Sequence, residues 1–456
     1  MIALLSLLLA ALALPAAVDA KTLAGNGESF MYIQLDGQVF GHGRTVYGLL
    51  ATGIPNGLSI QRPTAVVNVS NVTDITIGDT YSCLVDQGAA KCSGQNAGRL
   101  GNGLSDFSWL PVSVTGLKQD VVEVFANKAF SFAILANGTA MGWGLNTYGQ
   151  LMDNTTVTTL VPVPILVGMQ VKQIAATQVS ACALTVGGKV YCAGQNAQGA
   201  LGDGTLISRT TPMPVQGLSE VTASIAGGFL SFVCALDIQG LARCWGRGAD
   251  AQLGTGVVQS YSALPTIPAG LENVVVDELV ASQKAIFFIL ESNRSALVAG
   301  TSEENAFGTG ASTKYYTAVP FAGGVTGIKV LAGGYRTTCI FNQADELWCV
   351  GDSQYYQLGQ GDIADSPVLV RVQNMATRVP SASPTASPTL APTAAPALPT
   401  VAPTTLAPVV ATAAPASSST AAPAASSSPS TSSPSTSAAA TVVPGLIATG
   451  ALLLAF

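Results

Sequence analysis

The residues of this chain with the clearest chemistry are eight cysteines that fall into four couples. The partners lie nine or ten positions apart, as Cys83 and Cys92, Cys182 and Cys192, Cys234 and Cys244, and Cys339 and Cys349. The segments between them, such as ALTVGGKVY, read as hairpins. Facing residues of an antiparallel hairpin have Cα atoms about 4.5–5.5 Å apart, a separation that a disulfide accepts. We therefore predict four disulfides, one within each couple.

Metal binding by the cysteine couples is the alternative reading, and other catalytic chemistry is poorly represented. Zinc couples are usually closer together and are often completed by histidine, whereas the chain has one histidine, His42. No nucleophile–base pair, shared carboxylate motif or phosphate loop is evident. Asp153, Asp203 and Asp362 recur at one step of a repeat, where Asp is a common turn residue and only weak evidence for calcium. We predict no catalytic, cofactor-binding or metal-binding residues, and no enzyme.

Five asparagines stand in Asn-x-Ser/Thr sequences, which are acceptors for N-linked glycans in an exported chain. They are Asn68, Asn71, Asn137, Asn154 and Asn293. Asn137 precedes Gly138 in a hairpin-turn dipeptide, so we expect it at a loop tip.

A glycine recurs at intervals of 50 to 54 residues and marks seven copies of one unit. The positions are Gly41, Gly94, Gly144, Gly194, Gly246, Gly300 and Gly351. The copies read GWGLNTYGQLMDN, CSGQNAGRLGNG, CAGQNAQGALGDGT, CWGRGADAQLGTG and CVGDSQYYQLGQGD, and the first and sixth are degenerate. A strand rich in Pro and Val follows, as in LPVSV or SPVLVRV. A period near 50 indicates one supersecondary unit repeated around a ring or along a solenoid.

This pattern resembles the regulator of chromosome condensation repeat, whose copies carry a W-G-x-N-x-x-G-Q-L-G-like core. The resemblance covers residues 21–379 and implies an all-β fold, a seven-bladed β-propeller with four-stranded blades. Asn96, Asn146 and Asn196 are expected to satisfy backbone groups of the repeat turns. The first copy lacks a preceding Pro-Val strand and the last has an extra one. We therefore expect strand 367–372 to complete the first blade and close the ring.

Both ends of the chain carry targeting signals. Residues 1–20 read as a signal peptide with an apolar run and small residues before Lys21; an uncleaved anchor is the alternative. Residues 380–440 are almost entirely Ser, Thr, Pro and Ala and predict a disordered, O-glycosylated stalk. Residues 441–456 are apolar and predict a signal for a glycosylphosphatidylinositol (GPI) anchor. The lipid would be attached at Ser435, Ser437 or Ala438; a simple membrane span is the alternative.

Composition and compartment together limit the function. Charged residues make up 10% of the chain and the net charge is −6, which argues against a nucleic-acid surface. The resemblance implies guanine-nucleotide exchange on a small nuclear GTPase and chromatin binding, but the export signals conflict with that activity. We predict a monomeric recognition or scaffold protein of the secretory pathway, at the extracellular face of the plasma membrane or cell wall. Its partner is an unidentified extracellular protein or glycan, and inhibition of another protein is a further alternative.

By the symmetry of a propeller, the loops between the glycine core and the Pro-Val strand share one face. Their aromatic residues and one arginine are of the types that dominate interface hot spots. The predicted partner-binding residues are Phe107, Trp109, Arg209, Tyr261, Tyr315 and Tyr316. The alternative is that these side chains pack over blade edges.

Overall fold

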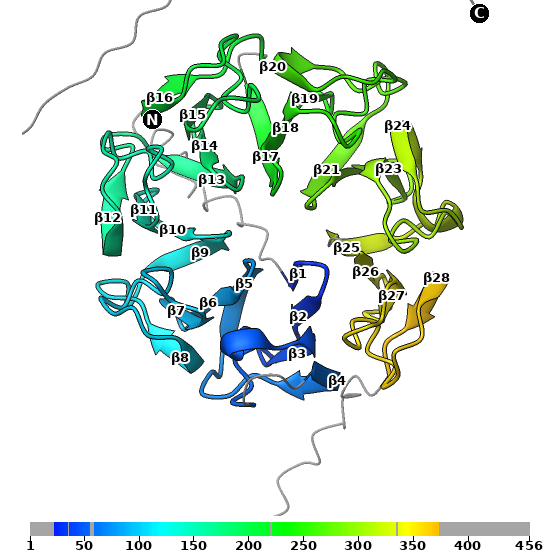
Figure 1. The fold of residues 1–456 in the computed structure, drawn as a ribbon, viewed down its shortest axis with the longest axis horizontal. Coiled ribbons are helices and arrows are strands. Elements are labelled where there is room, and N and C mark those ends of the chain that lie inside the picture. Colours follow the sequence, from blue (N-terminus) through cyan, green and yellow to red (C-terminus); the bar gives the residue numbers. More distant parts are fainter. Residues whose placement is uncertain (1–21, 35, 55–58, 219–220, 334–335, 374–456) are drawn as a thin grey trace, which may run out of the picture. The chain divides into compact units, whose positions relative to one another are not determined.

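The chain forms a ring of seven four-stranded antiparallel sheets, as seen in a computed structural model (Figure 1). The structure describes residues 22–373 except 35, 55–58, 219–220 and 334–335. The predicted signal peptide, stalk, lipid-attachment residues and C-terminal signal all lie outside the described residues. The seven-bladed, all-β architecture is confirmed.

Each blade uses four consecutive strands. Blade 1 contains β1 (Leu23–Gly25), β2 (Ser29–Ile33), β3 (Val39–Arg44) and β4 (Ser59–Ala65); blade 2 contains β5 (Val72–Ile77), β6 (Tyr81–Asp86), β7 (Ala89–Gly94) and β8 (Ser108–Ser113). Blade 3 contains β9 (Val121–Ala126), β10 (Phe130–Leu135), β11 (Ala140–Gly144) and β12 (Thr159–Ile165); blade 4 contains β13 (Val171–Ala176), β14 (Ser180–Thr185), β15 (Val190–Gly194) and β16 (Arg209–Pro214). Blade 5 contains β17 (Thr222–Gly228), β18 (Phe232–Asp237), β19 (Ala242–Arg247) and β20 (Tyr261–Thr266); blade 6 contains β21 (Val276–Ala281), β22 (Ala285–Leu290), β23 (Ala296–Thr301) and β24 (Lys314–Pro320). Blade 7 contains β25 (Ile328–Gly333), β26 (Thr337–Asn342), β27 (Leu347–Gly351) and β28 (Ser366–Arg371).

Two single-turn 3-10 helices accompany the strands, η1 (Val46–Gly48) and η2 (Phe321–Gly323). Within the described part of the chain, no helix is both long enough and apolar enough to cross a membrane.

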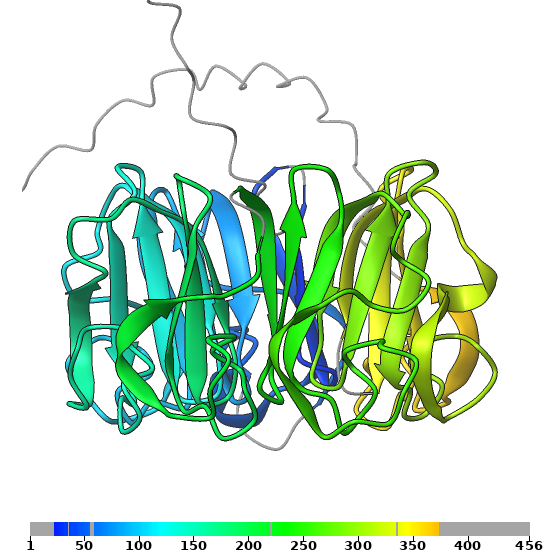
Figure 2. The ribbon, with the colours of Figure 1, turned by 90° about the horizontal axis from the view of Figure 1, so that it is seen from above.

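The first strand of each blade lies toward the centre of the ring and the fourth lies at its rim (Figure 1). Because the strands alternate in direction, their connections gather on two faces (Figure 2). The long-loop face carries the first-to-second connections and the loops between third and fourth strands, 45–54, 95–107, 145–158, 195–208, 248–260, 302–313 and 352–365. The short-turn face carries the second-to-third turns and the links between blades, such as 87–88, 136–139, 291–295, 66–71 and 166–170.

An anchoring glycine ends the regular part of every third strand. Each has a positive φ and faces the start of the second strand, as Gly94 (φ +113) faces Tyr81. A Cβ on Gly94 would lie 2.5 Å from the Cα atom of Tyr81, so a side chain cannot be accommodated. Beside it, pairing with the fourth strand shifts register by a bulge. The anchor of blade 1 is Gly43 (φ +103) facing Ser29, not Gly41 as expected from the sequence.

All four predicted disulfides are confirmed. Each joins Cα partners of the second and third strands, with Cα atoms 4.0–4.1 Å apart, and no described cysteine is free. In the three other blades the equivalent pairs are Met31 and Gly41, Phe132 and Gly142, and Phe287 and Val298. Apolar packing therefore replaces the covalent bond in those blades.

The expected closure by an exchanged strand is wrong. β28 pairs with β27 and is the fourth strand of blade 7. Blade 1 receives its own fourth strand from β4, which pairs with β3. The Pro-Val strand thus follows its repeat core in every blade, and the ring closes where blades 1 and 7 meet. We call this contact the closing seam.

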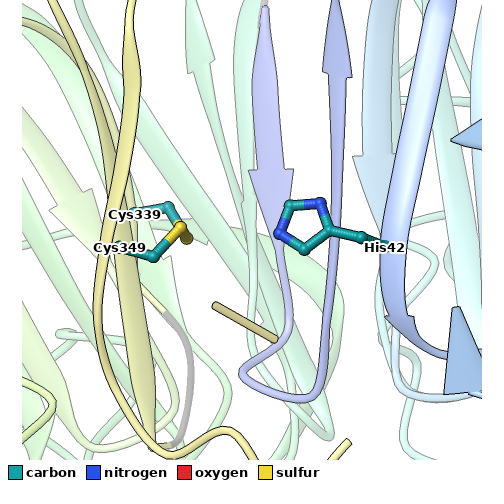
Figure 3. Close-up of side chains that lie close together, drawn as sticks. All are labelled: His42, Cys339 and Cys349. Carbon is teal, nitrogen blue, oxygen red and sulfur yellow. A yellow bond between two sulfur atoms is a disulfide. The ribbon is translucent and has the colours of Figure 1, made fainter. Parts of the chain in front are cut away.

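Side chains close the seam. Leu23, Phe30 and Tyr32 of blade 1 belong to one buried cluster with Phe341, Leu347 and Val372 of blade 7. In the same place His42 is fully buried and its ring is stacked on Phe30 with centroids 5.9 Å apart. The His42 ring faces the Cys339–Cys349 disulfide (Figure 3).

His42 makes the contact that a tryptophan makes in other blades. Trp143 and Trp245 directly precede their anchoring glycines, and their Nε1 atoms donate to the carbonyls of Arg99 (2.8 Å) and Ala200 (3.0 Å) in the preceding blade. His42 directly precedes Gly43, and its Nε2 atom lies 2.9 Å from the carbonyl of Gln357 in blade 7. A carbonyl can only accept, so Nε2 carries the proton and donates it.

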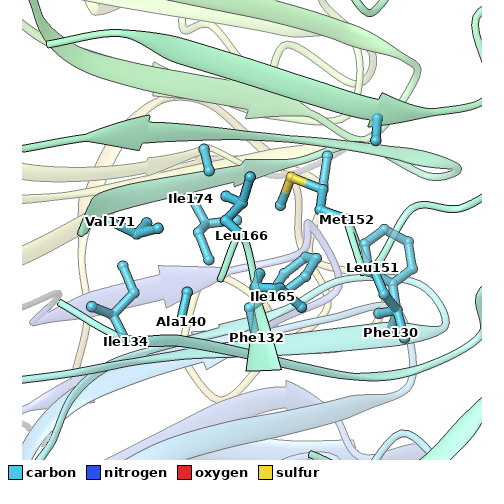
Figure 4. Packing of buried hydrophobic residues seen from close by; sticks show 13 residues of the cluster. Phe130, Phe132, Ile134, Ala140, Leu151, Met152, Ile165, Leu166, Val171 and Ile174 are labelled. Atoms are coloured by element: carbon cyan, nitrogen blue, oxygen red, sulfur yellow. The ribbon is translucent and has the colours of Figure 1, made fainter. Parts of the chain in front are cut away.

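Similar apolar clusters fill the spaces between neighbouring blades. Between blades 3 and 4, Phe130, Phe132 and Ile165 pack against Val171 and Ile174 (Figure 4). Each of the seven buried clusters contains residues of two neighbouring blades, so no blade completes its core alone.

Removal of one disulfide is expected to weaken the ring without unfolding it. The bond between Cys182 and Cys192 closes a loop of 10 residues, for which chain entropy gives about 2–3 kcal/mol. The double variant Cys182→Ala/Cys192→Ala should lose that amount in reversible denaturant unfolding while it keeps its far-ultraviolet spectrum. Unchanged stability, or loss of the fold, would contradict this account.

The stability of the ring should depend on pH through His42. Burial lowers the pKa of His42 to about 4, against 6.5 in the unfolded chain. Below pH 6.5 the unfolded chain therefore binds a proton that the folded ring excludes, and the free energy of unfolding falls as pH falls. Between pH 7 and pH 5 the expected loss is about 2 kcal/mol.

His42→Gln is the control, because glutamine keeps a neutral donor at this position. His42 is the one histidine of the chain, so the variant should show a flat profile between pH 7 and pH 5. Parallel profiles for the two proteins would show that His42 is not buried in its neutral form.

Candidate functional site

The predicted partner-binding residues lie at the rim of the long-loop face. Phe107 immediately precedes β8, which contains Trp109; Arg209 and Tyr261 begin β16 and β20; Tyr315 and Tyr316 lie in β24. They are thus spread over blades 2, 4, 5 and 6. The structure does not gather the six residues into one site.

Arg209 and Tyr315 have partners within their own blades. The Arg209 Nε atom lies 3.2 Å from Asp203, and the hydroxyl of Tyr315 lies 2.7 Å from that of Thr309. The Tyr315 ring also packs against Phe307, with centroids 6.0 Å apart. These contacts agree with the alternative that such side chains cover blade edges.

Phe107 and Trp109 do come together, and a tyrosine from the neighbouring blade joins them. The Phe107 and Trp109 rings meet edge to face with centroids 5.3 Å apart, and the Tyr47 ring lies 6.4 Å from Phe107. Tyr47 is 39% exposed and Phe107 is 48% exposed. We call these three residues the aromatic patch. It lies on the long-loop face and spans blades 1 and 2.

Sequence reasoning missed Tyr47 because the first repeat is degenerate. A signal was present in the Tyr47-Gly48 pair, which occupies the place of the repeat-core glycine. Gly48 (φ +86) rests on the backbone of β8, where a Cβ would lie 2.5 Å from the Cα atom of Trp109. The close approach of η1 to β8 is what brings Tyr47 beside Phe107.

The loops that form this rim are fastened to the next blade. The amide of Gly103 donates to the carbonyl of Leu160 (3.0 Å), and that of Gly204 donates to Ala263 (3.1 Å). The amide of Gly256 likewise donates to Tyr316 (2.8 Å). Hydrogen bonds to the neighbouring blade therefore hold these loops of the long-loop face in place.

The recurring Asp and Asn residues hold these loops in shape. The side-chain amide of Asn146 donates to Asp153 (2.9 Å), and its oxygen accepts from the amide of Leu151 (2.9 Å). Asn196 and Asp203 repeat this arrangement. Burial alone would raise the pKa of Asp203, but hydrogen bonds from Thr205 and Arg209 outweigh it and lower the pKa below its usual value. The predicted structural role of Asn146 and Asn196 is confirmed.

A small cavity lies at the centre of the long-loop face. Its volume is about 120 Å³, and Asn26, Asp79, Asn127 and Gln283 contribute to its lining. The side-chain amides of Asn26 and Asn127 donate to the carbonyls of Gly78 (2.9 Å) and Thr177 (2.8 Å) in the next blades. This cavity is smaller than the roughly 300–1,000 Å³ of typical small-molecule sites. The side-chain amides of Asn26 and Asn127 that line it connect neighbouring blades.

The closing seam also places three potential metal ligands together. Atoms of His42, Cys339 and Cys349 lie within 4.8 Å of one another. Both sulfur atoms are joined in a disulfide, so neither is the thiolate that a metal ion requires. His42 alone remains, and its Nε2 atom is bonded to Gln357. His42 and the disulfide therefore contribute to the contact between blades 1 and 7.

Comparison with known proteins agrees with the fold. Models of the regulator of chromosome condensation (RCC1) repeat match residues 187–234 and 121–150. The E3 ubiquitin-protein ligases HERC2 of Homo sapiens and Mus musculus are each 31% identical over 140 residues, which is 28% of this chain. The aligned part is 3% of the length of those relatives.

Solved structures resemble the ring as a whole. Yeast RCC1 (Prp20), solved bound to Kap60, is 18% identical with a TM-score of 0.66 over 76% of this chain and 86% of that chain. Prp20p from Saccharomyces cerevisiae gives 19% and 0.66 over 76% and 88%. Human WBSCR16 gives 17% and 0.61 over 74% and 93%. At these identities the likeness concerns the fold.

Seven recurring cores, the register of their anchoring glycines and the matching repeat models lead to one assignment. The chain is a seven-bladed β-propeller, and two of its segments, residues 121–150 and 187–234, match the regulator of chromosome condensation (RCC1) repeat.

Proposed function

We propose that this protein is a non-enzymatic recognition module whose long-loop face binds an extracellular protein or glycan. The aromatic patch carries this proposal, because three aromatic side chains from two blades meet on one exposed surface. Tyr and Trp are enriched in interface hot spots, since they offer large contact areas with few rotatable bonds.

The rigidity of the rim supports this use of the face. Loops that are already bonded to the next blade lose little conformational entropy when a partner binds. The Tyr47 and Phe107 rings each lie in contact range of a neighbouring ring before any partner arrives. We therefore expect a partner to bind the aromatic patch without rearrangement of its rings.

We place the protein in the secretory pathway and, after export, at the cell surface. Four buried disulfides are compatible with an oxidising compartment. The signal sequence at residues 1–20 and the apolar C-terminal signal at 441–456 support export and lipid anchoring. The Ser/Thr/Pro/Ala-rich stretch 380–440 would then hold the ring away from the membrane.

Exchange of guanine nucleotides is the competing function. The Prp20p structure is described together with its binding to Gsp1p and histones, and these are properties of that protein. The export signals and the net charge of −6 favour recognition outside the cytosol for this chain. Inhibition of a secreted protein would use the same face and is included in the proposal as one form of recognition.

Phe107→Ala should weaken binding of the labelled protein to intact cells. Removing a central hot-spot ring typically costs about 1.4 kcal/mol or more, which is a tenfold rise in Kd. Ile363→Ala is the matched control, because Ile363 is an exposed apolar residue on the same face in blade 7. Saturation binding measured by flow cytometry gives both values.

Both variants should melt at the wild-type temperature, since Phe107 is half exposed. Equal affinities for wild type and Phe107→Ala would rule out the aromatic patch as the binding surface.

A small nuclear GTPase loaded with fluorescent GDP should release its nucleotide at the same rate with and without this protein. Prp20 provides the positive control for the assay. Any dose-dependent acceleration by this protein would favour exchange activity over the proposed function.

A further inference from the structure

The five glycan-acceptor sequences are not distributed evenly over the two faces. Asn68 and Asn71 lie in the link between blades 1 and 2, and Asn137 and Asn293 lie in the second-to-third turns of blades 3 and 6. These four residues are therefore on the short-turn face. Asn154 lies in loop 145–158 on the long-loop face. All five are exposed.

Backbone contacts confirm that the links and the turns share a face. The amide of Val72 donates to the carbonyl of Gly37 (3.0 Å), and that of Val171 donates to Gly138 (2.8 Å). The amide of Gly327 donates to the carbonyl of Asn293 (3.0 Å). Each turn is thus bonded to the link or strand that begins the next blade.

At two of the sites the side-chain oxygen makes the hydrogen bond within the turn, and not the nitrogen to which sugar is attached. The Oδ1 atom of Asn137 accepts from the amide of Thr139 (2.9 Å), and that of Asn293 accepts from Ser295 (3.0 Å). These bonds use the oxygen and leave Nδ2, the atom to which sugar is attached, on an exposed residue. A glycan at either turn tip is compatible with the folded ring.

We propose that N-linked oligosaccharides on Asn68 or Asn71, on Asn137 and on Asn293 cover the short-turn face, so that the partner meets the long-loop face. This inference rests on the proposed function, because it requires export. It adds which face carries most of the glycans. The one acceptor on the long-loop face, Asn154, lies in blade 3 and outside the aromatic patch. The glycans would stand at three places around the ring, beside blades 1 and 2, at blade 3 and at blade 6.

The modification is a group transfer by the oligosaccharyltransferase of the secretory pathway. The Asn Nδ2 atom forms a bond to the anomeric carbon of the sugar, and the bond from that carbon to the phosphate of a polyprenyl-diphosphate donor breaks. The amide loses one proton, and the lipid diphosphate leaves. Because transfer takes place on the nascent chain, native exposure determines which sites tolerate the glycan after folding.

Peptide mapping of the full-length chain secreted by a eukaryotic host tests the placement. N-glycanase in heavy-oxygen water converts each occupied Asn to labelled Asp, which mass spectrometry assigns to a site. We expect label at all three places on the short-turn face. An absence of label from two or more of the three places would overturn the inference.

A designed glycan tests which face is open. Asp106→Asn creates the sequence Asn-Phe-Ser around Phe107 on the long-loop face, and Asp106→Asn/Ser108→Ala is the control that cannot be glycosylated. The first variant should bind cells at least tenfold more weakly than the control. Equal binding by a protein shown to carry the new glycan would overturn the face assignment.

These results also separate the inference from the proposed function. If Phe107→Ala binds weakly but the native sites are empty, recognition stands and the glycan inference fails. If the native sites are occupied but the wild-type protein binds no cells, the proposed function fails and the glycan placement stands.

Discussion

The structure depends on the fact that each blade is completed by its neighbour. A four-stranded sheet of this size exposes an apolar face on either side, and the buried clusters of the ring are made by two blades together. At three of the seven anchoring glycines, a ring nitrogen on the preceding residue adds direction to this packing. Trp143, Trp245 and His42 all reach a carbonyl of the preceding blade, which fixes how far one blade turns relative to the next. Six of the seven contacts between blades are helped by chain connectivity, whereas among the described residues the closing seam depends on side-chain contacts, one of them with a backbone carbonyl.

This construction explains how the site can be rigid although it consists of loops. The loops of the long-loop face end in tight, positive-φ turns and are bonded to the rim of the following blade. Their exposed side chains are therefore held at fixed positions around the ring. The aromatic patch follows from one such docking contact, the approach of Gly48 to β8. Partner binding would then depend on the exposed side chains of the loops, whereas the repeat core determines only where the loops lie.

Much of the fold could be predicted from the sequence, because it depends on residues that recur at fixed, short spacings along the chain. The cysteine couples predicted disulfides since facing positions in a hairpin have a fixed spacing, and the recurring asparagines predicted bonds to backbone groups of the repeat turns. What failed was reasoning that needed the whole ring. The degenerate first repeat places Gly41 at the recurring interval, although Gly43 is the anchor. Strand 367–372 belongs to blade 7 because each Pro-Val strand follows the core of its own repeat. Tyr47 and the sorting of the glycan acceptors onto faces also required three-dimensional neighbours.

Native-state hydrogen exchange measures the central claim most directly, because it reports which parts of a folded protein open first. If side-chain contacts close the ring without help from chain connectivity, amides of β1 to β3 and of β25 to β28 should exchange first in mild denaturant, with β28 opening together with β27. Blades 3 to 5 should remain protected until global unfolding. Earliest opening at an interior blade, or joint protection of β28 with the strands of blade 1, would contradict the account.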